Sequence, residues 1–268
     1  MKSFTYFDAH SHIHFADYDT DRDAVYARMQ EEGVGALAVG TDAATSRSAL
    51  KTAEEYDDIW ATVGMHPTDV LHATFDKKLF TEFAKHPKNV GIGECGLDYH
   101  HTEKSEDVLA KQKRMFEQHI EIALAVDKPL MIHCRPRPGS MDAYEDVLAI
   151  LEEHHKTAGE KLRGNIHFFV GSKELARRFL ELGFTLSFTG VITFARDYDE
   201  VVRFAPLDRI LSETDCPFVS PEPYRGRRNE PAYVRFTAQK IAEIRGEDEE
   251  KVLPALVRNV ERVFALEN

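Results

Sequence analysis

Three histidines at alternate positions, His10, His12 and His14, lie near the start of the chain within FDAHSHIHF. Alternate side chains of an extended strand share one face, so this spacing would bring imidazoles close together. Neutral imidazole is a common ligand of zinc and other first-row divalent cations. A lone HxH pattern also occurs on ordinary surface strands, so the metal hypothesis needs partners elsewhere in the chain.

Such partners stand at the ends of further apolar segments. The segments are short and rich in β-branched and aromatic residues, which is typical of buried strands. In a parallel barrel the C-terminal ends of all strands open onto one mouth, where residues distant in sequence meet. The groups at these ends, besides His10 and His12, are Asp8, His66, Glu94, His133, His167 and Asp215.

These groups suggest a pair of cations. Glu94 could bridge two ions because a carboxylate has two oxygens, with His10, His12 and Asp215 on one side and His133 and His167 on the other. Two ions about 3.5–4 Å apart can share an attacking water and clamp a phosphoryl group. Asp215 could orient that water and accept its proton, so no serine or cysteine nucleophile is required.

Each candidate ligand also has an ordinary structural explanation. Glu94, inside an apolar and glycine-rich segment, could form a salt bridge with an arginine of the barrel. His133 or His167 could be a core histidine bound to the backbone. We favour the ligand interpretation because a charged residue in an apolar strand is costly unless it is paired or metal-bound.

Residues around the same mouth are candidates for substrate contact. Guanidinium groups match phosphate oxygens, so we expect contacts from Arg135, Arg225 or Arg227, although loop arginines are commonly just solvated. His66 could contact a phosphate or pack against Pro67. We expect Asp8, Asp98 and Tyr99 to hold the ligands in place, as outer partners of metal sites do.

Eight apolar segments alternate with amphipathic stretches, which predicts a (β/α)₈ TIM barrel forming one domain over residues 1–268. An open doubly wound sheet is the competing fold, because repeated βα units do not prove closure. The predicted strands are 4–8, 36–41, 60–66, 90–94, 130–133, 165–169, 184–189 and 209–215. The predicted helices are 20–33, ended by Gly33, then 44–56, 103–129, stopped by Pro129, 139–155, with Ser140 as a possible cap, 231–246 and 248–268.

Composition narrows the function classes. The 268 residues carry a formal net charge of −12, which argues against an extended nucleic-acid surface, normally basic. Apolar runs long enough to cross a bilayer and the apolar core of a secretion signal are missing, so we expect a cytoplasmic protein. The three cysteines, Cys95, Cys134 and Cys216, are far apart and each follows a proposed ligand, so strand alternation points them toward the helices as packing residues.

The motifs together resemble the TatD family of metal-dependent deoxyribonucleases. In order, these are FDAHSH, GMHP, GIGECGLDYH, MIHCR, HFFVGS and SETDCP, followed by PYRGRRNEPAYV, which is similar to the family's late loop. The resemblance implies a TIM barrel with two divalent ions that cleaves phosphodiesters, often as a DNA exonuclease. It also implies one metal held by His10, His12, Glu94 and Asp215, and another by Glu94, His133 and His167.

Two departures from this family concern the surroundings of the site. His14 stands where the family often has an acidic residue, and we expect it to be solvated or to cap a loop. After MIHCR the family usually continues with an acidic residue and alanine, whereas this chain has PRPGSMDAY. This loop, which begins with residues 135–139, lies at the predicted mouth and affects substrate preference rather than the metal ligands.

We therefore expect a monomeric phosphodiesterase that uses zinc, manganese, magnesium or nickel to hydrolyse DNA, preferably at single-stranded ends. The alternative is an amidohydrolase-type enzyme, such as a deaminase, cyclic amidase or lactonase. Many binuclear enzymes of that type bridge their metals with a carboxylated lysine on the fourth strand, where this chain has Glu94. A non-catalytic metal-binding protein ranks last, because the predicted ligand set is complete.

Overall fold

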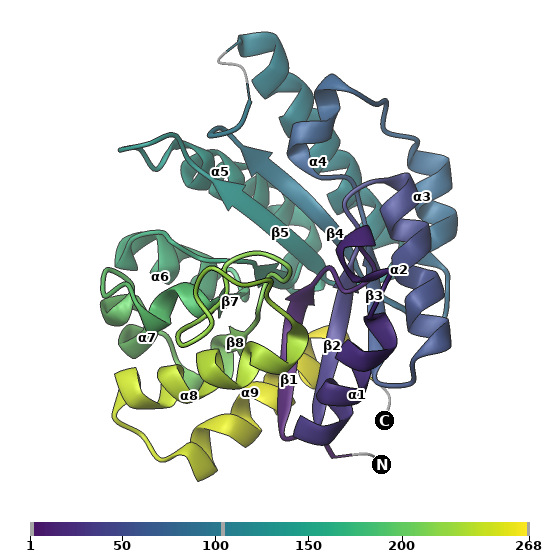
Figure 1. Cartoon of the computed structure of the whole chain (residues 1–268). Helices are drawn as coiled ribbons and strands as arrows, with labels where there is room; N and C mark the ends of the chain where they lie inside the picture. Colours follow the sequence, from purple (N-terminus) through teal and green to yellow (C-terminus); the bar gives the residue numbers. More distant parts are fainter. Residues whose placement is uncertain (1–2, 103–104, 267–268) are drawn as a thin grey trace.

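The computed structural model describes residues 3–102 and 105–266, and its centre is an eight-stranded parallel sheet with the strands in sequence order (Figure 1). Each strand runs into a helix on the outside of the sheet. The strands are β1 Tyr6–Ser11, β2 Val34–Val39, β3 Ile59–Val63, β4 Asn89–Asp98, β5 Leu130–Arg135, β6 Gly164–Ile166, β7 Thr185–Phe188 and β8 Ile210–Ser212.

The sheet closes on itself where the chain following β8 meets the end of β1. The Asp215 N–H donates to the His10 carbonyl at 2.9 Å, and the His12 N–H donates to the Cys216 carbonyl at 2.8 Å. These bonds complete a (β/α)₈ barrel, so the predicted TIM fold is confirmed and the open doubly wound sheet is excluded.

The six predicted helices are present, with two differences in detail, whereas the helices Lys77–Ala84, Lys173–Glu181 and Asp199–Phe204 were not predicted. Gly33 ends α1 in the left-handed conformation at φ +67°, as predicted, but α4 ends before Pro129 because Asp127 is already left-handed. Ser140 is not the cap of α5, because Met141 holds that position, although the Ser140 hydroxyl accepts from the Asp142 N–H at 3.0 Å. The helices are α1 Arg22–Glu32, α2 Ala43–Glu55, α3 Lys77–Ala84, α4 Glu106–Val126, α5 Asp142–Ala158, α6 Lys173–Glu181, α7 Asp199–Phe204, α8 Val234–Arg245 and α9 Glu249–Phe264.

Residues 103 and 104 of the predicted helix 103–129, and residues 267 and 268 of the last one, lie outside the described residues. Within the described ranges, no helix combines the length and the apolar character needed to cross a membrane.

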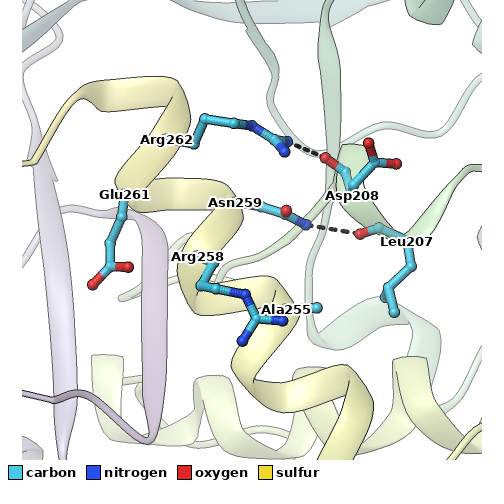
Figure 2. Close-up of a pocket in the computed structure, with 7 residues that line it drawn as sticks. All are labelled: Leu207, Asp208, Ala255, Arg258, Asn259, Glu261 and Arg262. Carbon is cyan, nitrogen blue, oxygen red and sulfur yellow. Dashed lines mark hydrogen bonds between the residues drawn. The ribbon is translucent and has the colours of Figure 1, made fainter.

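Helix α9 closes the N-terminal end of the barrel. Its Phe264 packs in one apolar cluster with Phe7, Leu37 and Met131, whose side chains lie inside the barrel. At the edge of this cluster, which forms the floor of the barrel, α9 and the turn before β8 border a hollow, where the Asn259 amide donates to the Leu207 carbonyl at 2.7 Å (Figure 2). The carbonyl groups of the turn are thus satisfied by α9, which fastens the helix to the sheet.

Irregularities in β1 and β4 decide which residues reach the opposite end. The register of β1 against β2 shifts by one residue between Asp8 and Ser11, so that Phe7 faces the interior core and His10 still faces inward farther along. A similar shift in β4 lies between Ile92 and Cys95. There Gly93 has φ +149°, and a Cβ on it would lie 2.2 Å from the Met131 carbonyl oxygen, so only glycine allows this approach.

Candidate metal centre at the mouth of the barrel

A cavity of about 690 Å³ opens at the C-terminal ends of the strands, and the predicted ligands meet there. His12, Glu94, His133, His167 and Asp215 line it, whereas His10 lies beneath them with no exposed surface. The remaining lining residues are Phe15, Thr41, His66, Thr68, Asp69, Asp98, His101, Arg135, Phe168, Phe218 and Val219.

Glu94 lies between two groups of histidines. Its Oε2 is 3.4 Å from His10 Nε2 and 3.8 Å from His12 Nε2. Its Oε1 is 2.9 Å from His133 Nδ1 and 3.8 Å from His167 Nε2. Each carboxylate oxygen therefore faces a different pair of imidazoles, which is the geometry that a bridging ligand between two cations requires.

Asp215 approaches the same space from the other side. Its Oδ1 lies 3.5 Å from His12 Nε2, 3.8 Å from His10 Nε2 and 4.0 Å from His167 Nε2. The residue adopts a left-handed backbone at φ +56°, which is uncommon outside glycine and is often found at functional sites. The turn after β8 thus aims the carboxylate into the histidine cluster.

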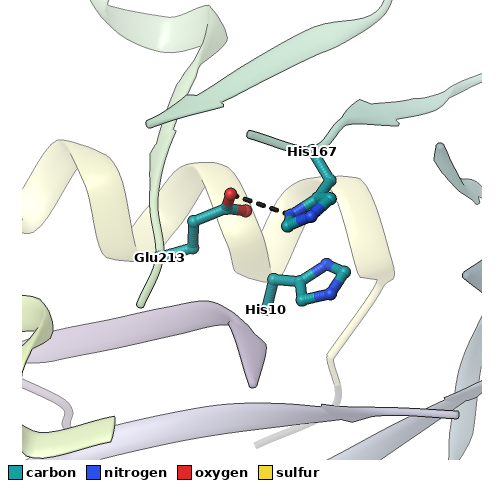
Figure 3. A group of neighbouring side chains, drawn as sticks. All are labelled: His10, His167 and Glu213. Atoms are coloured by element: carbon teal, nitrogen blue, oxygen red, sulfur yellow. Dashed lines mark ion pairs between the residues drawn. The ribbon is translucent and has the colours of Figure 1, made fainter. Parts of the chain in front are cut away.

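Three of the histidines are oriented through the ring nitrogen that faces away from the cluster. The backbone carbonyl of Val39 lies 2.8 Å from His12 Nδ1, and Asp98 Oδ2 lies 3.0 Å from His133 Nε2. Glu213 Oε1 lies 2.8 Å from His167 Nδ1 (Figure 3). An acceptor on one nitrogen leaves the lone pair of the other for a cation, as in carboxylate–histidine–metal arrangements.

Glu213 is the functional candidate that the sequence analysis missed. It is fully buried and also accepts from the Ser187 hydroxyl at 2.5 Å and from the Phe168 N–H at 2.8 Å. Its position two residues before Asp215 was the available signal, because alternate residues of a strand face the same side. Glu213 holds His167 against the cluster and joins it to the polar interior of the barrel.

The site fits a divalent cation because it contains a buried donor without a partner. Neither ring nitrogen of His10 has a hydrogen bond to any described residue, and its ring stacks on that of His167 with centroids 3.5 Å apart. Burial and the neighbouring His167 lower the pKa of His10 to about 3, so the ring is neutral at physiological pH. A buried neutral imidazole facing Glu94 offers what zinc and related ions bind.

Two of the candidate ligands, His133 and His167, would have to exchange a proton for a metal. Burial alone would lower the pKa of His133, but Asp98 and Glu94 raise it to about 8. In the same way, Glu213 overcomes the burial of His167 and raises its pKa to about 9. A cation placed against Glu94 would displace these protons, since metal binding and proton release are coupled.

The predicted outer partners behave differently from one another. Asp8 accepts from the Thr214 N–H at 2.8 Å and from its hydroxyl at 2.5 Å, so it links β1 to the chain after β8 behind the ligands. Asp98 contacts His133, as expected. Tyr99 points away, because its hydroxyl donates to Asp146 at 2.7 Å, and so it does not hold a predicted ligand.

Two of the predicted substrate contacts line the cavity and two do not. His66 Nε2 is 3.6 Å from Glu94 Oε1, and Arg135 also borders the cavity. Arg225 instead lies 3.8 Å over the ring of Phe194, and Arg227 lies 5.9 Å over the ring of Tyr224, so neither borders the cavity.

Expectations for three other kinds of residue can also be compared with the structure. His14 is buried, with 4% of its surface exposed, so the expected solvated position is wrong. His101, an exposed loop residue, lines the cavity, and its Nδ1 lies 2.9 Å from Asp98 Oδ2. Cys95, Cys134 and Cys216 pack in the core between sheet and helices, as predicted.

A closed (β/α)₈ barrel with histidines and carboxylates gathered at the C-terminal ends of its strands defines the class of metal-dependent hydrolases. Comparison with known families narrows the class. Residues 7–265 match the family described as TatD related DNase, and the chain belongs to this family. The family resemblance inferred from the motifs is confirmed.

Individual relatives agree with this assignment over nearly their full length. The chain is 41% identical to the uncharacterized metal-dependent hydrolase YabD of Bacillus subtilis, covering 97% of this chain and 99% of that protein. It is 32% identical to the 3'-5' ssDNA/RNA exonuclease TatD of Citrobacter rodentium, covering 97% and 98%. The crystal structure of YJJV, a TatD homolog from Escherichia coli K12, superposes with a TM-score of 0.87 at 25% identity, covering 98% and 99%.

Proposed function

We propose that this metal-dependent hydrolase is a two-metal phosphodiesterase that removes nucleotides from the ends of single-stranded nucleic acid, with DNA as the principal substrate. The observation that carries the proposal is the position of Glu94, whose two oxygens face separate histidine pairs at the bottom of an open cavity. The 3'-5' ssDNA/RNA exonuclease named among the relatives supports this substrate class.

In the proposed roles, His10, His12, Glu94 and Asp215 would hold one ion, and Glu94, His133 and His167 the other. Ions held there would polarise the phosphodiester and lower the pKa of an attacking water from 15.7 to about 7.

The protein groups would place and deprotonate the reactants. Asp215, pointing into the cluster, would orient the water and accept its proton. Arg135 and His66, on the cavity wall, would bind the non-bridging phosphate oxygens.

The charge of the molecule agrees with local rather than extended binding of the strand. A net charge of −12 disfavours broad contact with the backbone of a duplex, whose affinity depends on many cationic contacts. A single strand end needs only the cations and a few donors at the mouth, and its bases can be displaced to let a phosphate reach a recessed site.

The test is hydrolysis of end-labelled oligonucleotides by protein stripped with a chelator and reloaded separately with Mg²⁺, Mn²⁺, Zn²⁺ or Ni²⁺. We expect stepwise shortening of single-stranded DNA, weaker cleavage of blunt duplex, and no cleavage by the stripped protein. Labels at the 5' and 3' ends report the direction of degradation, and an RNA strand of the same sequence tests sugar preference.

The same preparations should be assayed on a panel of amides and lactones. If the protein hydrolysed these compounds but left both single-stranded and duplex DNA intact with every metal, the proposal would be overturned in favour of an amidohydrolase-type reaction.

A further inference from the structure

Three phenylalanines lie beside the candidate ligands on the wall of the cavity. The ring of Phe15 stacks on His12 at 4.5 Å, and that of Phe218 lies 6.2 Å from His12. Phe168 contacts the neighbouring His167, with ring centroids 5.9 Å apart. An otherwise polar and charged cavity therefore has aromatic surface next to the groups that would hold the cations.

Phe218 differs from the other two because its ring is largely free. Its exposed fraction is 53%, the highest among the exposed large apolar residues of the described chain, the others being Leu71, Met141 and Phe204. Its position three residues after Asp215 places it at the rim of the same turn. The exposed ring is therefore available for contact with a ligand in the cavity.

The backbone that carries Phe218 is firmly held. Its N–H donates to the Asp215 carbonyl at 3.0 Å, and its own carbonyl accepts from the Asn229 amide at 2.6 Å. Val219, the next residue, adopts φ +50°, a conformation that β-branched residues rarely take.

The late loop around Phe218 is in turn tied to the start of the chain. The Arg228 guanidinium binds Asp21, and the Tyr18 hydroxyl donates to the Asn229 carbonyl at 2.6 Å. Phe218 is therefore an exposed ring on a backbone that hydrogen bonds hold in place. A contact that is already in position loses little conformational entropy when a ligand binds.

We propose that Phe218 is a stacking platform for an unpaired nucleobase, namely the base of the nucleotide whose phosphodiester lies over Glu94. The proposal rests on the proposed function and adds the subsite that selects single-stranded ends. A base stacks on a phenylalanine through its flat face, which is covered on both sides within a duplex. Phe15 and Phe168 form the apolar walls beside this position.

The test compares wild-type protein with Phe218→Ala on two single-stranded oligonucleotides, one normal and one with an abasic terminal nucleotide. We expect Phe218→Ala to lower kcat/KM about tenfold on the normal strand, and loss of the base to lower wild-type activity by a similar factor. On the abasic strand the two proteins should be equally active, because the contact is already missing.

Two further variants control for indirect effects. Phe218→Trp should retain activity on the normal strand, since it keeps the aromatic face. Phe204→Ala removes another exposed phenylalanine, which is 36% exposed on α7 and does not line the cavity. This variant should leave kcat/KM unchanged on both oligonucleotides. Melting temperatures of all variants should lie close to that of the wild type.

If Phe218→Ala lowered kcat/KM equally on the normal and the abasic oligonucleotide, the stacking proposal would be overturned, because the ring would then support the loop rather than the base. Binding measured by fluorescence anisotropy separates the two proposals. If wild-type protein binds the normal strand more tightly than the abasic one, and Phe218→Ala removes the difference, the platform stands even if neither strand is cleaved. In that case only the proposed nuclease function fails.

Discussion

The two ends of the barrel are built on opposite principles. At the N-terminal end, α9 covers an apolar cluster that includes Phe7 and Phe264, and the polar groups at its edge are paired, as in the Asn259–Leu207 contact (Figure 2). At the C-terminal end, Glu94 and several histidines face an open cavity, and both nitrogens of His10 lack hydrogen-bond partners among the described residues. One end stabilises the fold, and the other keeps reactive groups available at some cost in stability.

A polar layer joins the two ends. The Asn165 amide donates to the Ser187 hydroxyl at 2.7 Å, and that hydroxyl donates to Glu213 at 2.5 Å. Glu213 then holds His167. The chain of bonds inside the barrel shows how the folded scaffold sets the direction of a ligand without lying in the cavity itself.

The largest expected effect at the mouth comes from Glu94→Gln. Loss of the negative charge shared by both histidine groups should lower turnover by roughly a thousandfold or more, because neither ion is then neutralised. Metal content by elemental analysis should fall in parallel with hydrolysis of the oligonucleotide. Glu82→Gln, an exposed change on α3, is the matched control. Full activity in Glu94→Gln would contradict the proposal that Glu94 bridges two cations.

At the floor, Phe264→Ala should produce the complementary result. Truncating this buried ring should lower the free energy of unfolding by about 3–5 kcal/mol, with turnover per folded molecule unchanged. Trp60, the single tryptophan of the sequence, contacts the same cluster, so its fluorescence in a urea titration reports the change. Lost turnover at unchanged stability would show that the two ends are not separate.

Between the ends, His119 should make stability depend on pH. It is buried in α4, where its Nε2 accepts from the Met65 N–H at 3.0 Å and its Nδ1 donates to the Met115 carbonyl at 2.8 Å. Burial lowers the pKa of His119 to about 4 from an ordinary 6.5, so the neutral ring stabilises the fold above pH 6.5.

This stabilisation should decline as pH falls from 6.5 toward 4, by about 3 kcal/mol in total. His119→Gln should be less stable than wild type at pH 8, with the difference narrowing across that range. Chemical unfolding of both proteins at a series of pH values measures this difference, and a constant difference would contradict the assignment.

The smallest of the expected effects comes from Glu213→Gln, which leaves every ligand in place but weakens the hold on His167. We expect metal affinity or turnover to fall about 10–100-fold, with partial recovery at higher metal concentration. Metal titration followed by activity measures both. Ser187→Ala is a milder variant in the same chain of bonds, and an effect larger than that of Glu213→Gln would contradict the proposed order of contacts.

The barrel and the ligand cluster could be predicted because both depend on position along regular elements. The alternation of apolar segments with helices indicated the fold, and the placement of Glu94 and His133 at the ends of predicted strands indicated their convergence, although β4 continues to Asp98 and β5 to Arg135. Glu213 was missed because its spacing from Asp215 places both carboxylates on one side but does not show which one faces the cavity and which one lies behind a histidine. That distinction depends on side-chain packing between strands.

Loop residues were the least predictable part of the site. Arg225 lies against Phe194 and Tyr99 binds Asp146, and both contacts depend on the path of a loop or a neighbouring helix rather than on local pattern. His14 follows the same alternation as His10 and His12 but does not line the cavity, because β1 ends at Ser11.

The register shift in β1 has a consequence for both ends of the barrel. One residue between Asp8 and Ser11 lets the same strand present Phe7 to the floor and both His10 and His12 to the mouth. A regular strand of the same length that presented Phe7 inward would turn His10 and His12 toward the helices, because they lie three and five residues farther on. The shift thus lets one strand serve both the apolar interior and the candidate metal centre, whereas a β1 of the same length without it would supply only one of the two.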